Sequence, residues 1–365
     1  MMENNRSYKG KALIAMSGGV DSSVAAYLMS EQGYDCIGCT MRLYENDMIG
    51  RDILDTCCSL ESTEDARSVT DNIGIPYHIF HYEELFKQEV IEPFVRCYEA
   101  GSTPNPCIEC NRRLKFYHLY NKMRELGCEL IVTGHYARVE RDEASGRYLL
   151  KKALYDKKDQ SYVLYMLTQE QLEHTRFPLG EISKDETRRI AQEHEFRNAK
   201  KHDSQDICFV PDGDYVEFLE RYRGKAYERG DFVDKDGNVL GKHKGFVHYT
   251  IGQRKGIGIA AAFPLYVTAI DPRTNTVTLG RNEDLFREEL IADRINLISV
   301  DSIKEPMRIK AKLRYKHQEQ PATVTQIDDD RIKVVFDEAQ RAITKGQAVV
   351  LYDGDVVVGG GTICQ

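Results

Sequence analysis

Short apolar runs alternate with segments of helical periodicity through the first half of the chain. Residues 12–16 (ALIAM) predict a strand, and residues 22–32 predict a helix that ends at Gly33. Ser62 and Asp65 resemble a capping box at the start of a later helix. Because parallel strands need crossover helices, this alternation predicts an α/β domain with a parallel sheet and helices on both faces. The other expected elements are strands at 34–41, 77–80 and 129–134, and helices at 62–74, 83–97 (around Pro93) and 112–126.

Beyond about residue 208 the pattern changes to short strands separated by glycine-rich turns. Strands are expected at 267–270, 276–279, 308–316, 331–336 and 348–358. This spacing predicts a small central β-rich domain followed by a C-terminal β-barrel. We therefore expect three domains, at 1–208, 209–282 and 283–365.

Composition narrows the class of protein. With 41% hydrophobic and 30% charged residues, the 365-residue chain is not mainly disordered. No apolar run approaches the roughly 20 residues of a membrane helix, and the first residues lack a secretory signal, so we expect a cytoplasmic protein with no membrane partner. The net charge of −8 means that a nucleic-acid site would have to be a local basic surface.

The most informative segment is residues 17–23 (SGGVDSS), between a predicted strand and a predicted helix. Backbone N–H groups and the positive end of the helix would converge there on an anion, and the glycines allow a close approach. Asp21 would hold the loop or help to bind Mg²⁺. The alternative is a plain glycine turn with a serine cap. No lysine follows as in a Walker A loop, and the segment instead resembles the loop of the ATP-pyrophosphatase family, which cleaves ATP between its α- and β-phosphates.

Three cysteines are candidates for sulfur chemistry. Cys107 and Cys110 follow a proline-rich segment, and Cys110 is expected near the start of the helix at 112–126, where the helix dipole favours a thiolate. Cys208 lies where the α/β domain is expected to end, so one thiol could carry a persulfide that the other resolves. The alternatives for the Cys107–Cys110 pair are half of a zinc site with Cys57 and Cys58, a redox pair, or buried thiols. By contrast, we expect core positions for Cys36, Cys39 and Cys128.

Basic residues gather in three places. Residues 308–316 (RIKAKLRYK) alternate cations with mostly apolar residues, so a strand there would present its cations on one face. The other groups lie at 151–158 and 242–255. Each alone is as consistent with a solvated surface, but together they favour RNA binding.

These motifs resemble the tRNA-specific 2-thiouridylase family over nearly the whole chain. The matching segments are SGGVDSS, TPNPCIECNRRLKF, VTGHYAR, KKDQSYVLY, SQDICF and HYTIGQRKGIGI. The resemblance implies an ATP- and Mg²⁺-dependent sulfurtransferase that thiolates C2 of the wobble uridine in the anticodon arm of tRNA, with sulfur from a cysteine desulfurase or a sulfur carrier. It also implies contacts of ATP with Ala15, Met16, Ser17, Gly18, Gly19, Val20, Asp21, Ser22, Met41 and Gly134, of the target base with Asn105, Pro106 and Cys107, and of tRNA with His135, Lys158, Asp159, Gln160, Arg314, Tyr315 and Gln347.

The same resemblance assigns the nucleophile to Cys110 and the persulfide to Cys208. Many members have Asp at the position of Cys107, which weakens a proton-accepting role there. Three thiols in one pocket would also suit a [4Fe–4S] cluster with one open iron, so a persulfide and a cluster-bound sulfide are both open, with persulfide favoured. Two rival functions are an adenylating ligase that uses ammonia or an amine, and a non-catalytic RNA-binding iron–sulfur scaffold.

Overall fold

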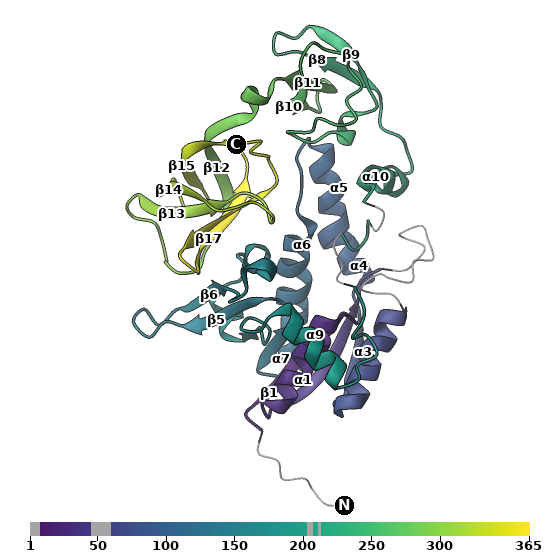
Figure 1. Ribbon diagram of the computed structural model, residues 1–365, viewed down its shortest axis with the longest axis vertical. Helices are drawn as coiled ribbons and strands as arrows, with labels where there is room; N and C mark the ends of the chain where they lie inside the picture. Colours follow the sequence, from purple (N-terminus) through teal and green to yellow (C-terminus); the bar gives the residue numbers. More distant parts are fainter. Residues whose placement is uncertain (1–7, 45–59, 203–206, 211–212) are drawn as a thin grey trace, which may run out of the picture. The chain divides into compact units, whose positions relative to one another are not determined.

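The computed structural model describes residues 8–44, 60–202, 207–210 and 213–365, shown in Figure 1. Its contacts divide the chain into two compact units. Unit 1 comprises residues 1–90, 107–213 and 355–357, and unit 2 comprises residues 91–106, 214–354 and 358–365. No helix in the described ranges is long and apolar enough to cross a membrane.

Unit 1 is built on a five-stranded parallel sheet, which confirms the predicted α/β class. The strands follow the order β3-β2-β1-β4-β7, and every adjacent pair is parallel. Because β1 lies in the centre, the loop after it emerges at the carboxyl edge beside the ends of β2 and β4. The strands are β1 Lys11–Ala15, β2 Asp35–Arg42, β3 Tyr77–His81, β4 Leu130–Thr133 and β7 Thr175–Arg176.

Three helices share one apolar core with this sheet. They are α1 Val20–Glu31, α3 Leu60–Ile73 and α9 Lys184–Glu193. The core joins Ile14 of β1, Val24 of α1, Val69 of α3 and Ala191 of α9, all of which are buried. The other elements of unit 1 include the hairpin β5 Ala137–Arg141 and β6 Tyr148–Lys152, the helices α4 Glu83–Phe86, α6 Pro106–Glu109, α7 Leu119–Glu125 and α8 Gln169–Glu173, and the short 3-10 turns Asp156–Lys158 and Ser161–Val163.

The helix expected around Pro93 forms, and a π-helical segment precedes the proline. Helix α4 passes into the π-helix Lys87–Ile91 and then into α5, Glu92–Glu99. A proline cannot donate a hydrogen bond to the preceding turn, and the wider π turn takes up that mismatch without ending the helix.

Unit 2 contains two antiparallel-rich β structures, as the second half of the sequence predicts. A four-stranded sheet has the order β10-β11-β8-β9, and six strands, β12-β15-β14-β13-β16-β17, close into a barrel through the pairing of β12 with β17. Helix α10, Tyr215–Arg223, precedes them. The strands are β8 Gly230–Val233, β9 Val239–His243, β10 Tyr266–Asp271, β11 Thr276–Gly280, β12 Phe286–Leu297, β13 Met307–Lys312, β14 Gln320–Gln326, β15 Ile332–Arg341, β16 Ala348–Asp353 and β17 Val356–Ile363.

Three local predictions were wrong. The strand expected at 308–316 ends at Lys312, and residues 313–316 form a bend followed by a turn. The strand expected at 348–358 is a hairpin, since Gly354 adopts φ +60° in the turn between β16 and β17. Helix α3 is already formed at Leu60, so Ser62 does not cap it.

Candidate active site

The loop between β1 and α1 is held by its own serines. The N–H of Ser17 donates to Oγ of Ser22 (3.1 Å). The hydroxyls of Ser22 and Ser23 both donate to the carbonyl of Gly19, at 3.0 and 3.1 Å. Ser22 and Ser23 are therefore buried and stabilise the loop through these hydrogen bonds, while Ser17 is exposed. The sequence predicts that an anion binds to the first backbone N–H groups at the start of α1, and this stays a prediction.

Two glycines allow other segments to press against this loop. Gly18 has φ +73°, and a Cβ there would lie 2.2 Å from the carbonyl oxygen of Ser62 in α3. A Cβ on Gly134, just after β4, would lie 2.7 Å from the carbonyl carbon of Asp21 and from the nitrogen of Ser22. Gly134, predicted to contact ATP, thus lies directly against the loop.

The end of β2 fixes the backbone where β1 leaves the sheet. The N–H of Met16 donates to the carbonyl of Cys39 (2.7 Å), and the hydroxyl of Thr40 donates to the carbonyl of Met16 (2.7 Å). Met41, the next residue of β2, is half-buried. The structure therefore brings together the segment 15–22, Met41 and Gly134, all predicted to contact ATP.

Asp21 is paired with a lysine that the sequence analysis missed. Its Oδ1 accepts from Nζ of Lys184 (2.6 Å) and from the hydroxyl of Tyr136 (2.8 Å). Lys184 begins α9, and its side chain is only 12% exposed. Nothing in the local sequence marks it beyond the Ser183 cap, because the contact spans 163 positions.

The residues around Asp21 fit Mg²⁺ in one limited way. Mg²⁺ is usually held by one or two carboxylates together with the phosphates of the nucleotide, rather than by a protein cage. Asp21 would supply such a carboxylate at the loop. Among the residues that the structure describes, no group of three or more His, Cys, Asp or Glu side chains could hold a metal ion by itself.

Cys107 and Cys110 lie on a helical run that starts earlier than expected. The helix begins at Pro106 instead of residue 112, so Cys107 is in its first turn and Cys110 one turn further in. Cys107 is exposed and Cys110 half-buried. Cys110 is the first residue of a π-helix, Cys110–His118, which continues into α7. Segments of π-helix are frequent at functional sites.

The backbone of Cys208 is anchored in unit 1 by two aromatic residues. The hydroxyl of Tyr44 donates to the carbonyl of Cys208 (3.0 Å). Phe209 is buried, and its ring meets that of Phe86 edge-on at 5.6 Å. The thiol side chain itself is half-buried. Residues 204–206 of the same motif lie outside the described residues.

The cluster alternative stays a prediction. Among the described residues, Cys107, Cys110 and Cys208 form no group of three side chains that could hold a metal ion. The proposed zinc partners, Cys57 and Cys58, lie outside the described residues.

The remaining assigned cysteines are buried. Burial raises the pKa of Cys36 to about 12 and also raises the pKa values of Cys39 and Cys128, so these thiols are inert core groups, as expected.

The predicted tRNA contacts of unit 1 are tied into its own framework. Nδ1 of His135 lies 2.7 Å from the hydroxyl of Thr133, and burial together with Lys115 holds the pKa of His135 well below its ordinary value. The carboxylate of Asp159 is buried and accepts from Ser161 (2.8 Å). Oε1 of Gln160 accepts from the N–H of Tyr136 (3.0 Å), while Lys158 remains partly exposed.

In unit 2, Gln347 lies against the segment that precedes the predicted base contacts. Its Nε2 donates to the carbonyls of Thr103 (2.9 Å) and Pro104 (3.2 Å), directly before Asn105 and Pro106. Gln347 therefore braces the start of the TPNPC motif, a role that the sequence did not reveal.

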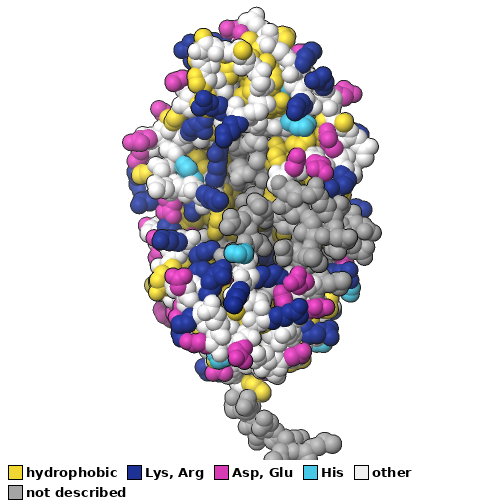
Figure 2. Space-filling view, turned by 45° about the vertical axis from the view of Figure 1, so that its right-hand side comes forward, with side chains coloured by type: hydrophobic (Ala, Val, Ile, Leu, Met, Phe, Trp, Pro, Cys, Tyr) yellow, Lys and Arg dark blue, Asp and Glu magenta, His cyan; other side chains and the backbone are white. Residues whose placement is uncertain are grey.

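The basic strand is one-sided, as predicted. Arg308 and Lys310 are exposed, while Ile309 and Ala311 are buried. Arg308 is nevertheless paired with Asp337 at 2.7 Å. On the face of the molecule in Figure 2, Lys and Arg side chains lie among Asp and Glu side chains.

Arg314 and Tyr315 lie beyond the end of this strand. The guanidinium of Arg314 donates to the carbonyl of Ala342. The ring of Tyr315 is 39% exposed, with Nζ of Lys312 at 5.8 Å from its centre.

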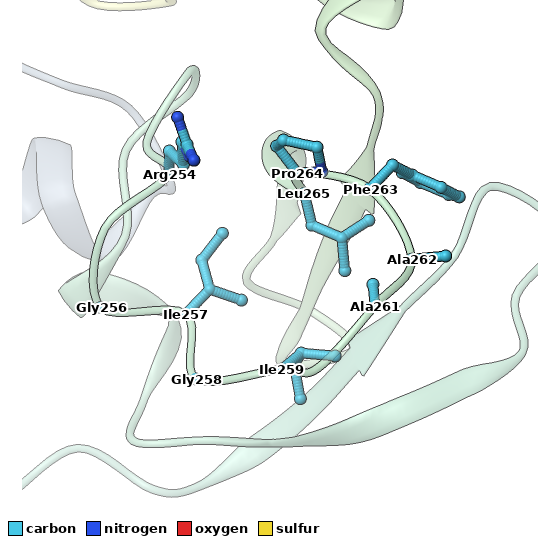
Figure 3. Close-up of a pocket in the computed structure, with 10 residues that line it drawn as sticks. All are labelled: Arg254, Gly256, Ile257, Gly258, Ile259, Ala261, Ala262, Phe263, Pro264 and Leu265. Atoms are coloured by element: carbon cyan, nitrogen blue, oxygen red, sulfur yellow. The ribbon is translucent and has the colours of Figure 1, made fainter.

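Unit 2 also has an open pocket of about 410 Å³, drawn in Figure 3. Most of its lining residues are apolar or glycine, Arg254 is its charged member, and none of the predicted site residues lines it. Arg254 belongs to the basic segment 242–255, so one cation of that segment borders the pocket.

Comparison with known proteins shows which protein families the chain resembles. Three family descriptions match it in succession: the tRNA methyl transferase HUP domain over residues 10–212, the tRNA methyl transferase PRC-barrel domain over 216–281, and the aminomethyltransferase β-barrel domain over 287–363. Among solved structures, NMN synthetase from Francisella tularensis aligns with a TM-score of 0.33 and 15% identity over 61% of this chain and 81% of its own, which is too weak to support an argument.

Curated relatives match over almost their whole length. The tRNA-specific 2-thiouridylase MnmA of Clostridioides difficile is 56% identical over 97% of this chain and 98% of its own. The protein of the same name from Clostridium acetobutylicum is 50% identical over 97% of this chain and 99% of its own. This chain belongs to the tRNA-specific 2-thiouridylase family.

Proposed function

We propose that this protein is the ATP-dependent enzyme that replaces the C2 oxygen of the wobble uridine of tRNA by sulfur. The observation that carries the proposal is full-length identity of 56% to a 2-thiouridylase. The assembled loop of residues 17–23 and the cysteines of two separate segments support it. The cytoplasmic setting and the sulfur donor, a cysteine desulfurase or a carrier, belong to the same proposal.

The first step is activation of the uridine. The C2 oxygen attacks the α-phosphorus of ATP, and pyrophosphate leaves, so a poor leaving group becomes AMP. The loop N–H groups and the start of α1 bind the phosphates and stabilise their charge. Bound Mg²⁺ would supply further neutralisation of phosphate charge, with Asp21 as its protein ligand.

The second step transfers sulfur. The outer sulfur of a persulfide on Cys208 attacks C2, which gives a disulfide between C2 and Cys208. The thiolate of Cys110 then attacks Sγ of Cys208, forms a Cys110–Cys208 disulfide, and leaves sulfide on C2 as AMP departs. An external thiol must reduce that disulfide before the next turnover. Cys107 would lie beside the base without acting as the proton acceptor.

The predicted contacts with tRNA fall into two groups. Asn105, Pro106 and Cys107 would border the target base, and Gln347 holds the two residues directly before them, Thr103 and Pro104. His135, Lys158, Asp159 and Gln160 from unit 1, and Arg314, Tyr315 and Gln347 from unit 2, would contact the anticodon arm. The uridine must leave its stack to reach the sulfur, as base-modifying enzymes generally require.

Purified protein, tRNA, ATP and a sulfide source test this proposal by nucleoside analysis. We expect 2-thiouridine in the wobble position, and its loss in Cys110→Ala and Cys208→Ala variants. Activity that survives both substitutions and requires ammonia would favour the rival ligase. A protein that binds tRNA but releases no pyrophosphate would favour the non-catalytic scaffold.

A further inference from the structure

Asn198 lies in the turn after α9. It contacts the loop of residues 17–23, from which it is far removed in the sequence. It is 3% exposed. Its Nδ2 donates to the carbonyl of Gly18 and to Oγ of Ser23, both at 2.9 Å. Because the Gly18 carbonyl can only accept, the amide nitrogen must face it, which fixes the orientation of the side-chain amide.

These bonds determine where the loop directs its N–H groups. In a planar trans peptide the carbonyl and the following N–H point in opposite directions. Since Asn198 draws the carbonyl of Gly18 inward, the N–H of Gly19 faces the other way. The carbonyl of Gly19 accepts from the hydroxyls of Ser22 and Ser23 and from the N–H of Ser23. Asn198 supports this arrangement, and with it the direction of the N–H of Val20, through its hydrogen bond to the hydroxyl of Ser23.

The segment that carries Asn198 is itself firmly anchored in unit 1. Nζ of Lys201 lies 3.0 Å from Asp65 and 3.1 Å from Oγ of Ser62 in α3. Arg197 lies 3.3 Å from the other oxygen of Asp65. The carboxylate of Asp65 is only 5% exposed, while the side chains of Lys201 and Arg197 are 22% and 53% exposed, so the anchor is buried at its acidic centre.

We propose that Asn198 is a positioning residue for the adenylation step: its amide aims the N–H groups of Gly19 and Val20 at the triphosphate of ATP. It acts through the loop and touches no reacting atom. The inference rests on the proposed function only in taking ATP as the anion that the loop binds. Loss of these two buried hydrogen bonds should therefore weaken nucleotide binding as well as lower the stability of the protein.

The test compares Asn198→Ala and Asn198→Asp with Asn72→Ala. Nδ2 of Asn72 donates to the carbonyl of His194 (3.2 Å) near the end of α9, so this control also removes an asparagine-to-backbone bond but leaves the loop untouched. The readouts are tRNA-dependent pyrophosphate release at varied ATP, the Kd for tRNA, and the melting temperature.

We expect the KM for ATP to rise about tenfold in Asn198→Ala, from the loss of the two hydrogen bonds, with an unchanged Kd for tRNA. The isosteric Asn198→Asp variant should show at least as large a rise, because it keeps the packing but faces the Gly18 carbonyl with an acceptor. In a Ser23→Ala background the further effect of Asn198→Ala should be smaller, since one of its partners is already gone.

The inference would be overturned if the KM for ATP of both Asn198 variants stayed within twofold of that of Asn72→Ala and only the melting temperature fell. Asn198 would then be a structural residue. That outcome differs from failure of the proposed function, in which the unaltered protein would release no pyrophosphate.

Discussion

Replacement of Asp21 by Asn tests the ion pair between Asp21 of the loop and Lys184 of α9. Oδ1 of Asp21 lies 2.6 Å from Nζ of Lys184, and the two side chains are 32% and 12% exposed. Asparagine keeps the size of the side chain and can still accept from the hydroxyl of Tyr136. The substitution therefore removes the charge with little change in packing.

The magnitude follows from the burial of the pair. Exposed ion pairs contribute about 0.2–1 kcal/mol, whereas removal of one partner of a fully buried pair costs about 3–5 kcal/mol. This pair is partly accessible, so we expect a loss of about 1–3 kcal/mol in the free energy of unfolding of unit 1. For a unit of this size, that loss lowers the melting temperature by roughly 2–10 °C.

The functional effect should exceed the effect on stability. Without the carboxylate, Lys184 is left uncompensated and the loop loses the ligand that we propose for Mg²⁺, so pyrophosphate release should be abolished. Binding of tRNA should stay largely unchanged, because its predicted contacts lie outside the loop. The assays are pyrophosphate release with saturating tRNA, filter binding of tRNA, and thermal unfolding.

A double substitution separates the effect of the lost carboxylate on pyrophosphate release from its effect on stability. Addition of Lys184→Met to Asp21→Asn removes the uncompensated cation, so the melting temperature should recover in part while pyrophosphate release stays absent. Full pyrophosphate release by Asp21→Asn would refute the catalytic assignment. Simultaneous loss of pyrophosphate release and tRNA binding would show instead that Asp21 only maintains the structure of the loop.

Four further predictions follow from the same structure. Gly134→Ala places a Cβ 2.7 Å from backbone atoms of the loop, so overpacking of about 1–3 kcal/mol should displace the loop and raise the KM for ATP; a normal KM would contradict the contact. The depressed pKa of His135 means that the unfolded chain binds the extra proton, so stability should fall as pH drops below about 6.5, and less so in His135→Gln, as measured by melting temperature against pH. Iodoacetamide should alkylate exposed Cys107 well before buried Cys39, whose pKa is raised by burial, as read by mass spectrometry; equal rates would mean that the core opens readily. Arg314→Ala should weaken tRNA binding and reduce its salt slope by about 1, and an unchanged slope would remove Arg314 from the interface.

Much of the fold could be predicted from the sequence because its signals are local. The apolar run at 12–16, the glycine at 33 and the alternation in the first half lead directly to β1, α1 and a parallel sheet. The elements that were misjudged are those decided by tertiary contacts. Ser62 and Asp65 bind Lys201 instead of capping a helix.

The candidate site likewise combines residues that a local motif reveals with residues that only the folded chain brings together. The residues of the loop are consecutive, so a motif could reveal them. The groups that hold the loop in place come from far along the chain: Lys184 lies 163 positions from Asp21, and Asn198 lies 180 positions from Gly18. A lysine in the first turn of a helix and an asparagine in a turn are ordinary residues in their local context. Only the folded arrangement places them beside the loop.

Nucleoside mass spectrometry of tRNA after incubation with the protein, ATP and a sulfur source tests the proposed function most directly. We expect 2-thiouridine in the wobble position, formed with one pyrophosphate released for each sulfur inserted, and absent in Cys110→Ala and Cys208→Ala. Thiolation that proceeds without pyrophosphate release, or that survives loss of both cysteines, would contradict it.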